Sequence, residues 1–204
     1  MHSHWNENQI HLRGRLTEVP RVSHINHDTT YCLLPLAVRR LSGAEDRLHV
    51  VAARPLLEGL TLEPGAPLGV RGEVRTFNNR SGVGSKLVVS VFAKVLSQAE
   101  GAEDENRLEL AGTLCKPPAL RSTPLGRTIC DMILAVNRRY GRADYLPCIA
   151  WGSLAHRCGA MAVGDPLHLA GRLQSRDYTK EIDGQLQART AFEVSIMSLL
   201  PPGP

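Results

Sequence analysis

Apolar and polar residues alternate along most of this chain, in short runs that end at turn residues. In residues 107–114, leucine or glycine occupies every second position, and polar or small residues fill the others. Alternation with a period of two predicts a strand with one buried face. Similar runs follow at residues 130–136, 145–151, 167–173 and 191–200, separated by Pro, Gly and Asp. We expect five strands here, with a short helix after the third, for which Ser153 is the expected N-cap.

The same pattern occurs 98 residues earlier in the chain. Asn8–Leu16 matches Asn106–Leu114, residues 36–40 match 134–138, and residues 70–74 match 169–173. A repeat of this length is a whole small domain. Its order of three strands, a short helix and two strands is that of the OB-fold, a five-stranded Greek-key barrel. Gly112 and Gly171 suit the sharp strand bends of such a barrel.

The predicted fold class is therefore all-β with short helices, as two tandem OB-folds. The expected domains are an N-terminal OB-fold at 1–99, an acidic linker at 100–105, a C-terminal OB-fold at 106–200 and a tail at 201–204. Residues 1–99 and 106–204 each carry 12 basic and 8 acidic side chains, and the linker contributes four acidic ones. Two basic domains favour an anionic partner, although a net charge of +4 is common in proteins that bind nothing charged.

Other features of the sequence limit the location and chemistry of the protein. The five cysteines show no C-x-x-C spacing, which is typical of a reduced, cytoplasmic protein whose thiols pack as small apolar side chains. No apolar leader and no run long enough to span a membrane is present, so neither secretion nor a membrane partner is expected.

No catalytic or metal-binding arrangement stands out. His24 and His27 have a spacing that metal ligands use, as do His2 and His4, but no cysteine accompanies them, so polar loop residues are the default. Asp144 and Asp165 fall at predicted turns, where aspartate bonds to its own backbone. No triad order, Walker loop or nucleotide fingerprint occurs. We expect no enzyme activity, no cofactor, no metal and no small-molecule substrate.

The nine aromatic residues other than histidine carry most of the functional signal. If Leu146, Cys148 and Ala150 fill the second barrel, Tyr145 and Trp151 project outward from the same strand, about 20 Å apart. On the fourth strand of this copy, Arg172, Arg176 and Tyr178 are expected to face outward. Arg138, Arg139 and Tyr140 lie in the loop after the second strand. Rings offer faces for stacking unpaired bases, and arginines follow phosphates. Each ring taken singly is more often structural; several on one face, interleaved with arginine, favour nucleic-acid binding.

The second copy resembles the bacterial single-stranded DNA-binding protein family. The matching stretches are 106–112, 123–126, 134–138, 143–152, 164–165 and 171–176. The family stacks bases on aromatics at four places. The resemblance implies that the binding residues in this copy are Tyr140, Tyr145, Trp151 and Tyr178, with Arg138, Arg172 and Arg176.

The first copy departs from this pattern. Arg47 stands where the second copy has Tyr145, and Ala53 where it has Trp151. Ser42 falls opposite Tyr140. Near the position equivalent to Tyr178, the candidate binding residues are Arg71, Arg75 and Phe77. The sequence leaves open whether the first copy keeps electrostatic contacts with DNA, having lost most of its stacking, or contacts proteins instead.

The resemblance implies sequence-independent binding and protection of single-stranded DNA in replication, recombination or repair. It also implies a homodimer that presents four OB-folds, in the nucleoid-associated cytoplasm. The family's acidic tail does not follow Pro204 in this sequence, so recruitment by that route is not expected. Two alternatives remain open: a replisome or primosome module that uses OB-folds for protein contacts, and an RNA-binding protein.

Overall fold

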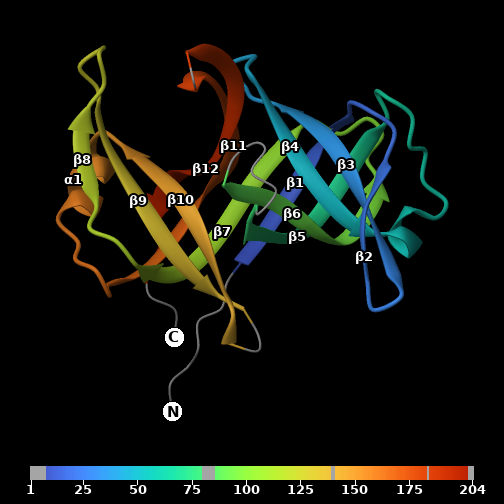
Figure 1. Ribbon diagram of the computed structural model, residues 1–204, viewed down its shortest axis with the longest axis horizontal. Helices are drawn as coiled ribbons and strands as arrows, with labels where there is room; N and C mark the ends of the chain where they lie inside the picture. Colours follow the sequence, from blue (N-terminus) through green and yellow to red (C-terminus); the bar gives the residue numbers. More distant parts are fainter. Residues whose placement is uncertain (1–7, 80–85, 139–140, 183, 202–204) are drawn as a thin grey trace. The chain divides into compact units, whose positions relative to one another are not determined.

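The first half of the chain folds into a closed barrel of strands. A computed structural model describes residues 8–79, 86–138, 141–182 and 184–201. The elements of the first barrel are β1 (Asn8–Leu16), β2 (Arg21–Asn26), β3 (Thr29–Arg39), β4 (Glu45–Ala53), the 3-10 helix η1 (Arg54–Leu57), β5 (Pro67–Asn78) and β6 (Leu87–Gln98). The strand order is β2-β3-β4-β6-β5-β1, and β1 also pairs with β3, which closes the barrel (Figure 1).

The second half repeats this topology. Its elements are β7 (Glu105–Leu114), β8 (Ala119–Ser122), β9 (Thr128–Asn137), β10 (Ala143–Trp151), α1 (Ser153–Gly159), β11 (Pro166–Ile182) and β12 (Gln185–Leu199). The strand order is β7-β11-β12-β10-β9-β8, closed by a pairing of β7 with β9. Each strand has a counterpart in the first barrel, so the prediction of two tandem OB-folds is confirmed. Within the described residues, no helix is long and apolar enough to cross a membrane.

Each barrel differs in detail from the sequence prediction. The described residues contain one strand more per copy, β2 and β8, because the chain after the first strand folds back as a hairpin on β3 or β9. The predicted cap of α1 is wrong: the helix begins at Ser153, Gly152 is its N-cap at φ 58°, and no side chain caps it.

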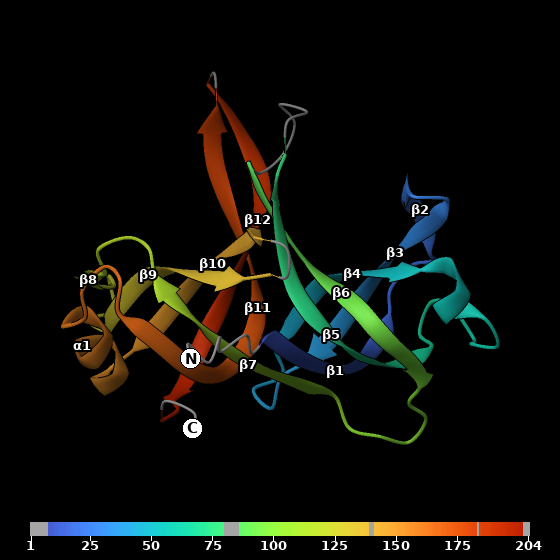
Figure 2. The same ribbon diagram turned by 90° about the horizontal axis from the view of Figure 1, so that it is seen from below.

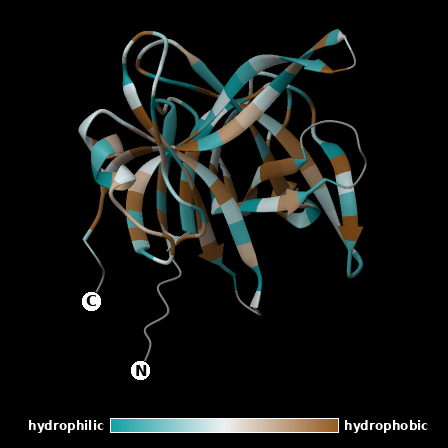
Figure 3. Ribbon diagram, turned by 60° about the vertical axis from the view of Figure 1, so that its left-hand side comes forward, coloured by the Kyte–Doolittle hydropathy of each residue, from teal (hydrophilic) through white to brown (hydrophobic). Residues whose placement is uncertain are grey.

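Alternation decides what each barrel buries, as the banding of apolar and polar colour along the strands shows (Figure 3). In the second barrel the predicted inward set is buried completely, for example Leu108, Leu110 and Leu134. Most of the polar side chains between them are exposed or half-buried. Burial of the apolar face of each strand therefore fixes which residues remain on the outer surface.

Two glycines mark where the first strand of each barrel changes partner. β1 pairs with β5 up to Arg15 and with β3 from Arg15 onward. At Gly14, just before this change, a Cβ would collide with the carbonyl oxygen of Ala37. Gly112 meets the carbonyl oxygen of Ala135 in the same way. Only glycine lets the backbones approach closely enough to close the barrel here.

The described chain divides into two compact units that do not coincide with the repeat. One contains Gln9–Arg107 and Gln174–Phe192, and the other contains Leu108–Leu173 and Glu193–Pro204. β11 and β12 run side by side as a long hairpin (Figure 2). Its outer half, Gln174–Phe192, belongs to the same unit as the first barrel. There the Ser175 amide donates to the Asp46 carboxylate at 3.0 Å, and the Arg47 amide donates to the Ser175 hydroxyl at 2.8 Å. The alternation of apolar and polar residues along a strand does not predict which residues the end of a hairpin contacts.

Candidate nucleic-acid interface

Two large rings lie exposed on the outer face of β10. Tyr145 is 51% exposed and Trp151 is 40% exposed, whereas Leu146, Cys148 and Ala150 between them are buried. The outward placement of both rings agrees with the alternation in the sequence. Six residues of strand separate them by about 20 Å, a span of several stacked bases. Their role in binding stays a prediction.

Trp151 has an apolar neighbour on the facing strand. It stands directly opposite Ile129 of β9, and side chains of directly opposed residues point to the same side of a sheet. Ile129 is only 2% exposed although it faces outward, so neighbouring side chains cover it. The indole therefore packs against an apolar side chain and keeps a face toward solvent. A ring that is already ordered in this way loses less conformational entropy when a base stacks on it.

Arg138 is held by a buried carboxylate. Its guanidinium binds Asp144 through two nitrogens, with Nε donating to Oδ2 at 2.5 Å, and Asp144 is fully buried. Asp144 thus lies within β10, and the expectation that it falls at a turn is wrong. Its register position, opposite Val136 inside the strand pair, decides this. About a quarter of the Arg138 side chain remains exposed, so any contact with DNA uses the outer edge of a guanidinium already fixed in place.

The first barrel repeats this ion pair at the equivalent position. Arg40 binds Asp46 through two nitrogens, with Nε to Oδ2 at 2.8 Å, and Asp46 is fully buried. The hydrogen bonds to Asp46 raise the pKa of Arg40 above its ordinary value. Because both barrels carry the pair at the same register, we interpret it as a fixture of the fold near the strand end.

The outer half of the β11–β12 hairpin places a cation over a ring. The Arg176 guanidinium lies 5.7 Å from the centre of the Tyr178 ring, and Arg176 is exposed. Arg172 lies half-buried nearer the base of β11. The Asp165 carboxylate accepts a hydrogen bond from the Ala162 amide at 2.8 Å, as expected for an aspartate at a turn. Tyr140, the remaining aromatic candidate, lies outside the described residues.

The candidate binding residues of the first barrel differ in exposure and in their contacts with other side chains. The Arg47 side chain is 78% exposed, 3.9 Å from the Glu45 carboxylate. Arg71 is exposed and Phe77 is 55% exposed on β5. Arg75 is half-buried, because it pairs with Glu73 and lies over the ring of Phe92 at 5.9 Å.

Sequence reasoning missed three rings on the first barrel. His24 of β2, Tyr31 of β3 and Phe92 of β6 contact one another in sequence, with centroids 4.8 Å and 5.7 Å apart. The repeat does not reveal them, because the equivalent residues of the second copy are not aromatic. The signal was present: Cys32, Val91 and Ala93 face inward, so alternation alone places Tyr31 and Phe92 outward.

The cysteines are packing residues in this structure. Cys130, Cys148 and Cys158 are buried, and burial is the main cause that raises the pKa of each thiol, to about 11 for Cys158. They are therefore protonated at neutral pH and poor nucleophiles. Among the described residues, no group of three or more His, Cys, Asp or Glu side chains is placed to hold a metal ion.

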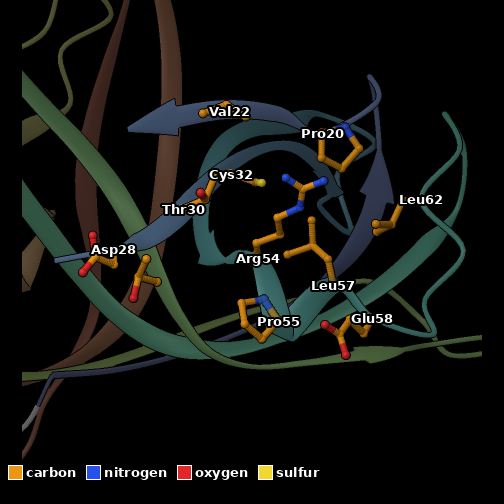
Figure 4. Close-up of a pocket in the computed structure, with 11 residues that line it drawn as sticks. Pro20, Val22, Asp28, Thr30, Cys32, Arg54, Pro55, Leu57, Glu58 and Leu62 are labelled. Atoms are coloured by element: carbon orange, nitrogen blue, oxygen red, sulfur yellow. The ribbon is translucent and has the colours of Figure 1, made fainter. Parts of the chain in front are cut away.

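A pocket of about 670 Å³ opens on the first barrel between β2, the start of β3 and the segment around η1. Figure 4 shows the Arg54 side chain pointing into it beside Cys32, with Pro55 and Leu57 from η1 below. In the second barrel, α1 packs on the equivalent strands, and the Cβ that an alanine at 159 would carry lies 3.3 Å from Leu120. The pocket thus reflects the replacement of a helix by a shorter 3-10 turn.

The sequence of the second barrel matches a known family. Residues 105–200 match the model of the Single-strand binding protein family. The second barrel is thus similar to that family. The family match covers every strand of the second barrel and both exposed rings of β10.

Known proteins resemble the chain over different lengths. It is 33% identical over 104 residues to single-stranded DNA-binding protein A of Bacillus subtilis, which covers 48% of this chain and 60% of that protein's length. It is 28% identical over 216 residues to the single-stranded DNA-binding protein of Thermus aquaticus, which covers 91% of this chain and 81% of that one. The solved wild-type Thermus aquaticus structure has a TM-score of 0.76 at 27% identity and covers 97% of this chain. Similarity in this case extends over both barrels.

Proposed function

We propose that the protein binds single-stranded DNA without sequence preference and protects it during replication, recombination or repair. The observation that carries the proposal is the pair of exposed rings on β10, Tyr145 and Trp151, within a barrel that matches the single-strand binding family. Bases that are unpaired can stack on these rings, whereas bases inside a duplex cannot reach them. The curated relatives named above are single-stranded DNA-binding proteins, which supports the choice of ligand.

Phosphate contacts supply the second part of the binding free energy. The candidate cations of the second barrel and its hairpin are Arg138, Arg172 and Arg176. Phosphate neutralisation releases counterions, so affinity should fall steeply as salt rises. A protein that binds in this way needs no bond-making chemistry, and we propose a binding role and not an enzyme.

Fluorescence titration tests the proposal. In a Trp5→Phe variant, Trp151 is the remaining tryptophan, and a base stacked on it should quench its emission when oligo-dT is added. Trp151→Ala and Tyr145→Ala should each raise the Kd about 5- to 150-fold, from about 1–3 kcal/mol per stacked base. Leu125→Ala, which removes an exposed apolar side chain from a loop of the same barrel, is the control and should bind as the parent does.

The alternatives make different predictions in the same experiment. If Trp151 is not quenched and a replication protein binds instead, the OB-folds serve protein contacts. If oligo-U binds more tightly than oligo-dT of equal length, the ligand is RNA. Unchanged affinity in both ring variants would rule out the β10 face as the binding surface.

The assembly we propose is a homodimer with four OB-folds. It rests on the resemblance to a family that presents four barrels and on the presence of two barrels in this chain. Four joined barrels raise the effective concentration of each for one strand of DNA. Light scattering with and without an oligo-dT of about 35 nucleotides checks the mass, since a site of roughly 4–16 nucleotides per barrel makes that length sufficient for several barrels.

A further inference from the structure

The outer face of the first barrel carries a continuous row of flat side chains, which we call the ring row: His24, Tyr31, Phe92 and Arg75. The His24 and Tyr31 rings are stacked, with centroids 4.8 Å apart and planes 8° apart. The Phe92 ring lies 5.7 Å from Tyr31, and the Arg75 guanidinium lies 5.9 Å from the centre of Phe92. The row therefore crosses the sheet from the edge strand β2 to β5.

The row crosses β4 where Tyr31 stands opposite Ala53 and Phe92 stands opposite Val51. β4 lies between β3 and β6, so the backbones that carry Tyr31 and Phe92 are about 10 Å apart. Their ring centres are nevertheless only 5.7 Å apart, so both rings lean over β4. Tyr31 stands directly opposite Ala53, whose methyl group leaves that space open.

The second barrel fills the same space the other way round. Its equivalent pair is Ile129 and Trp151, with the ring on β10 and the smaller side chain on β9. In the first barrel the ring is on β3 and the small residue on β4. The aromatic surface has thus moved to the neighbouring strand and has not been lost.

Cations accompany the row. Glu73 pairs with both Arg75 and Lys94, so one carboxylate is shared by two positive side chains and leaves a net positive charge. The Lys94 side chain is 56% exposed. Arg71, on the same strand as Arg75, is exposed as well. Rings next to cations on one surface are the combination that unpaired bases and their phosphates require.

The edge of the row is accessible. Every residue of β2 is exposed, including His24, whereas Tyr31 and Phe92 are half-buried with one side toward solvent. The imidazole covers the phenol ring in the parallel way in which a base would stack on it. Because His24 belongs to an exposed edge strand, a base can stack on the outer imidazole face or displace the imidazole from Tyr31.

We infer that the first barrel binds single-stranded DNA on the ring row, at positions different from those that the second barrel uses. The inference rests on the proposed function and specifies the surface of the first barrel that takes part in it. Phe77 and the position of Ala53 are then peripheral to stacking in this barrel, and Tyr31 and Phe92 are central.

A tryptophan reporter placed in the row tests this directly in the full chain. The reporter carries Trp5→Phe, Trp151→Phe and Tyr31→Trp, so that its fluorescence comes from position 31. Adding a dT oligomer of about 35 nucleotides should quench it to an extent comparable with Trp151 in the Trp5→Phe protein. If Tyr31→Trp disturbs the fold, as judged by circular dichroism, Phe92→Trp replaces it.

Affinity measurements complete the test. The double variant Tyr31→Leu with Phe92→Leu should raise the Kd for the same oligomer about fivefold, the low end for a stacked base, because the rings already cover part of each other. Tyr31→Phe keeps the ring and should bind as the parent does. Val95→Ala is the matched control, since it removes an exposed apolar side chain from the same strand as Phe92.

The outcomes separate this inference from the proposed function. Quenching at Trp151 without quenching at position 31, together with an unaltered Kd for the double leucine variant, overturns the ring row and leaves the proposed function standing. Absence of quenching at both positions overturns both. Quenching at position 31 by oligo-U but not by oligo-dT overturns the assignment of DNA as the ligand of the row.

Discussion

The two barrels share the residues that close them and differ in the residues that they display. The buried pairs Arg40–Asp46 and Arg138–Asp144 occupy equivalent positions. Gly14 and Gly112 lie equally close to a neighbouring carbonyl oxygen. The barrel geometry permits little variation at these points, because a buried carboxylate needs its partner and a Cβ has no room.

The outer faces of the two barrels, by contrast, carry different side chains at equivalent positions. At the strand positions where the second barrel exposes Tyr145 and Trp151, the first has Arg47 and Ala53. Rings appear instead on the strands beside them, at Tyr31 and Phe92. Rings on an exposed sheet face can come from any of its strands. A residue-by-residue comparison of the two barrels therefore overlooks the rings that the first barrel carries on other strands.

Removal of the buried carboxylates should have the largest effect. Asp46→Ala and Asp144→Ala should each lower the free energy of unfolding by about 2–3 kcal/mol, because each leaves a partly buried guanidinium without its partner. Asp46→Ala also removes the acceptor of the Ser175 amide. Urea unfolding followed by circular dichroism measures both. Arg121→Ala breaks an exposed pair with Asp131 and should change stability by less than about 1 kcal/mol; an equal loss in all three would contradict the assigned role.

The close glycines provide the next test. Gly14→Ala and Gly112→Ala should each destabilise the protein by about 1–3 kcal/mol, because the new methyl group meets backbone oxygen that cannot rotate away. Gly159→Ala is the comparison, since its Cβ would meet only the flexible Leu120 side chain at 3.3 Å. Thermal melts of the three variants rank the effects. A larger loss at Gly159 than at Gly112 would show that strand closure tolerates the methyl group.

An exchange of ring positions sharpens the comparison of the surfaces. Tyr31→Ile together with Ala53→Trp gives the first barrel the arrangement of Ile129 and Trp151. If the strand that carries the ring is immaterial, oligo-dT affinity should stay within about twofold of the parent, well inside the free energy of one stacked base. A loss as large as that of the double leucine variant would show that the position of the ring matters as much as its presence.

Arg47 should have the smallest effect. Arg47→Ala should weaken oligo-dT binding only slightly and reduce the slope of log K against log salt by about 0.7, as expected when one phosphate contact to a single strand is lost. Arg157→Ala, on α1, removes an exposed cation elsewhere and is the control. Titrations at several salt concentrations distinguish the two, and equal slopes in both variants would remove Arg47 from the DNA contacts.

Much of the architecture followed from alternation and repetition. Period-two runs located the strands, and the 98-residue repeat predicted two OB-folds. Alternation also predicted that Tyr145 and Trp151 face outward, because Leu146 and Cys148 between them had to face the core. The role of Asp144 could not be predicted in this way, since alternation does not show that the pairing of β9 with β10 brings Arg138 against its carboxylate.

The sequence by itself determined which face of each strand turns toward the core, because a strand with one apolar face can be buried in only one register. The tertiary structure decided which of the displayed side chains meet. Tyr31 and Phe92 are far apart in sequence and lie on strands separated by a third, where they stand opposite Ala53 and Val51. The same holds for Ser175, whose hydrogen bonds with Asp46 and Arg47 arise from the place where a long hairpin ends. Such contacts come from strand order and side-chain volume in three dimensions, which no local pattern encodes.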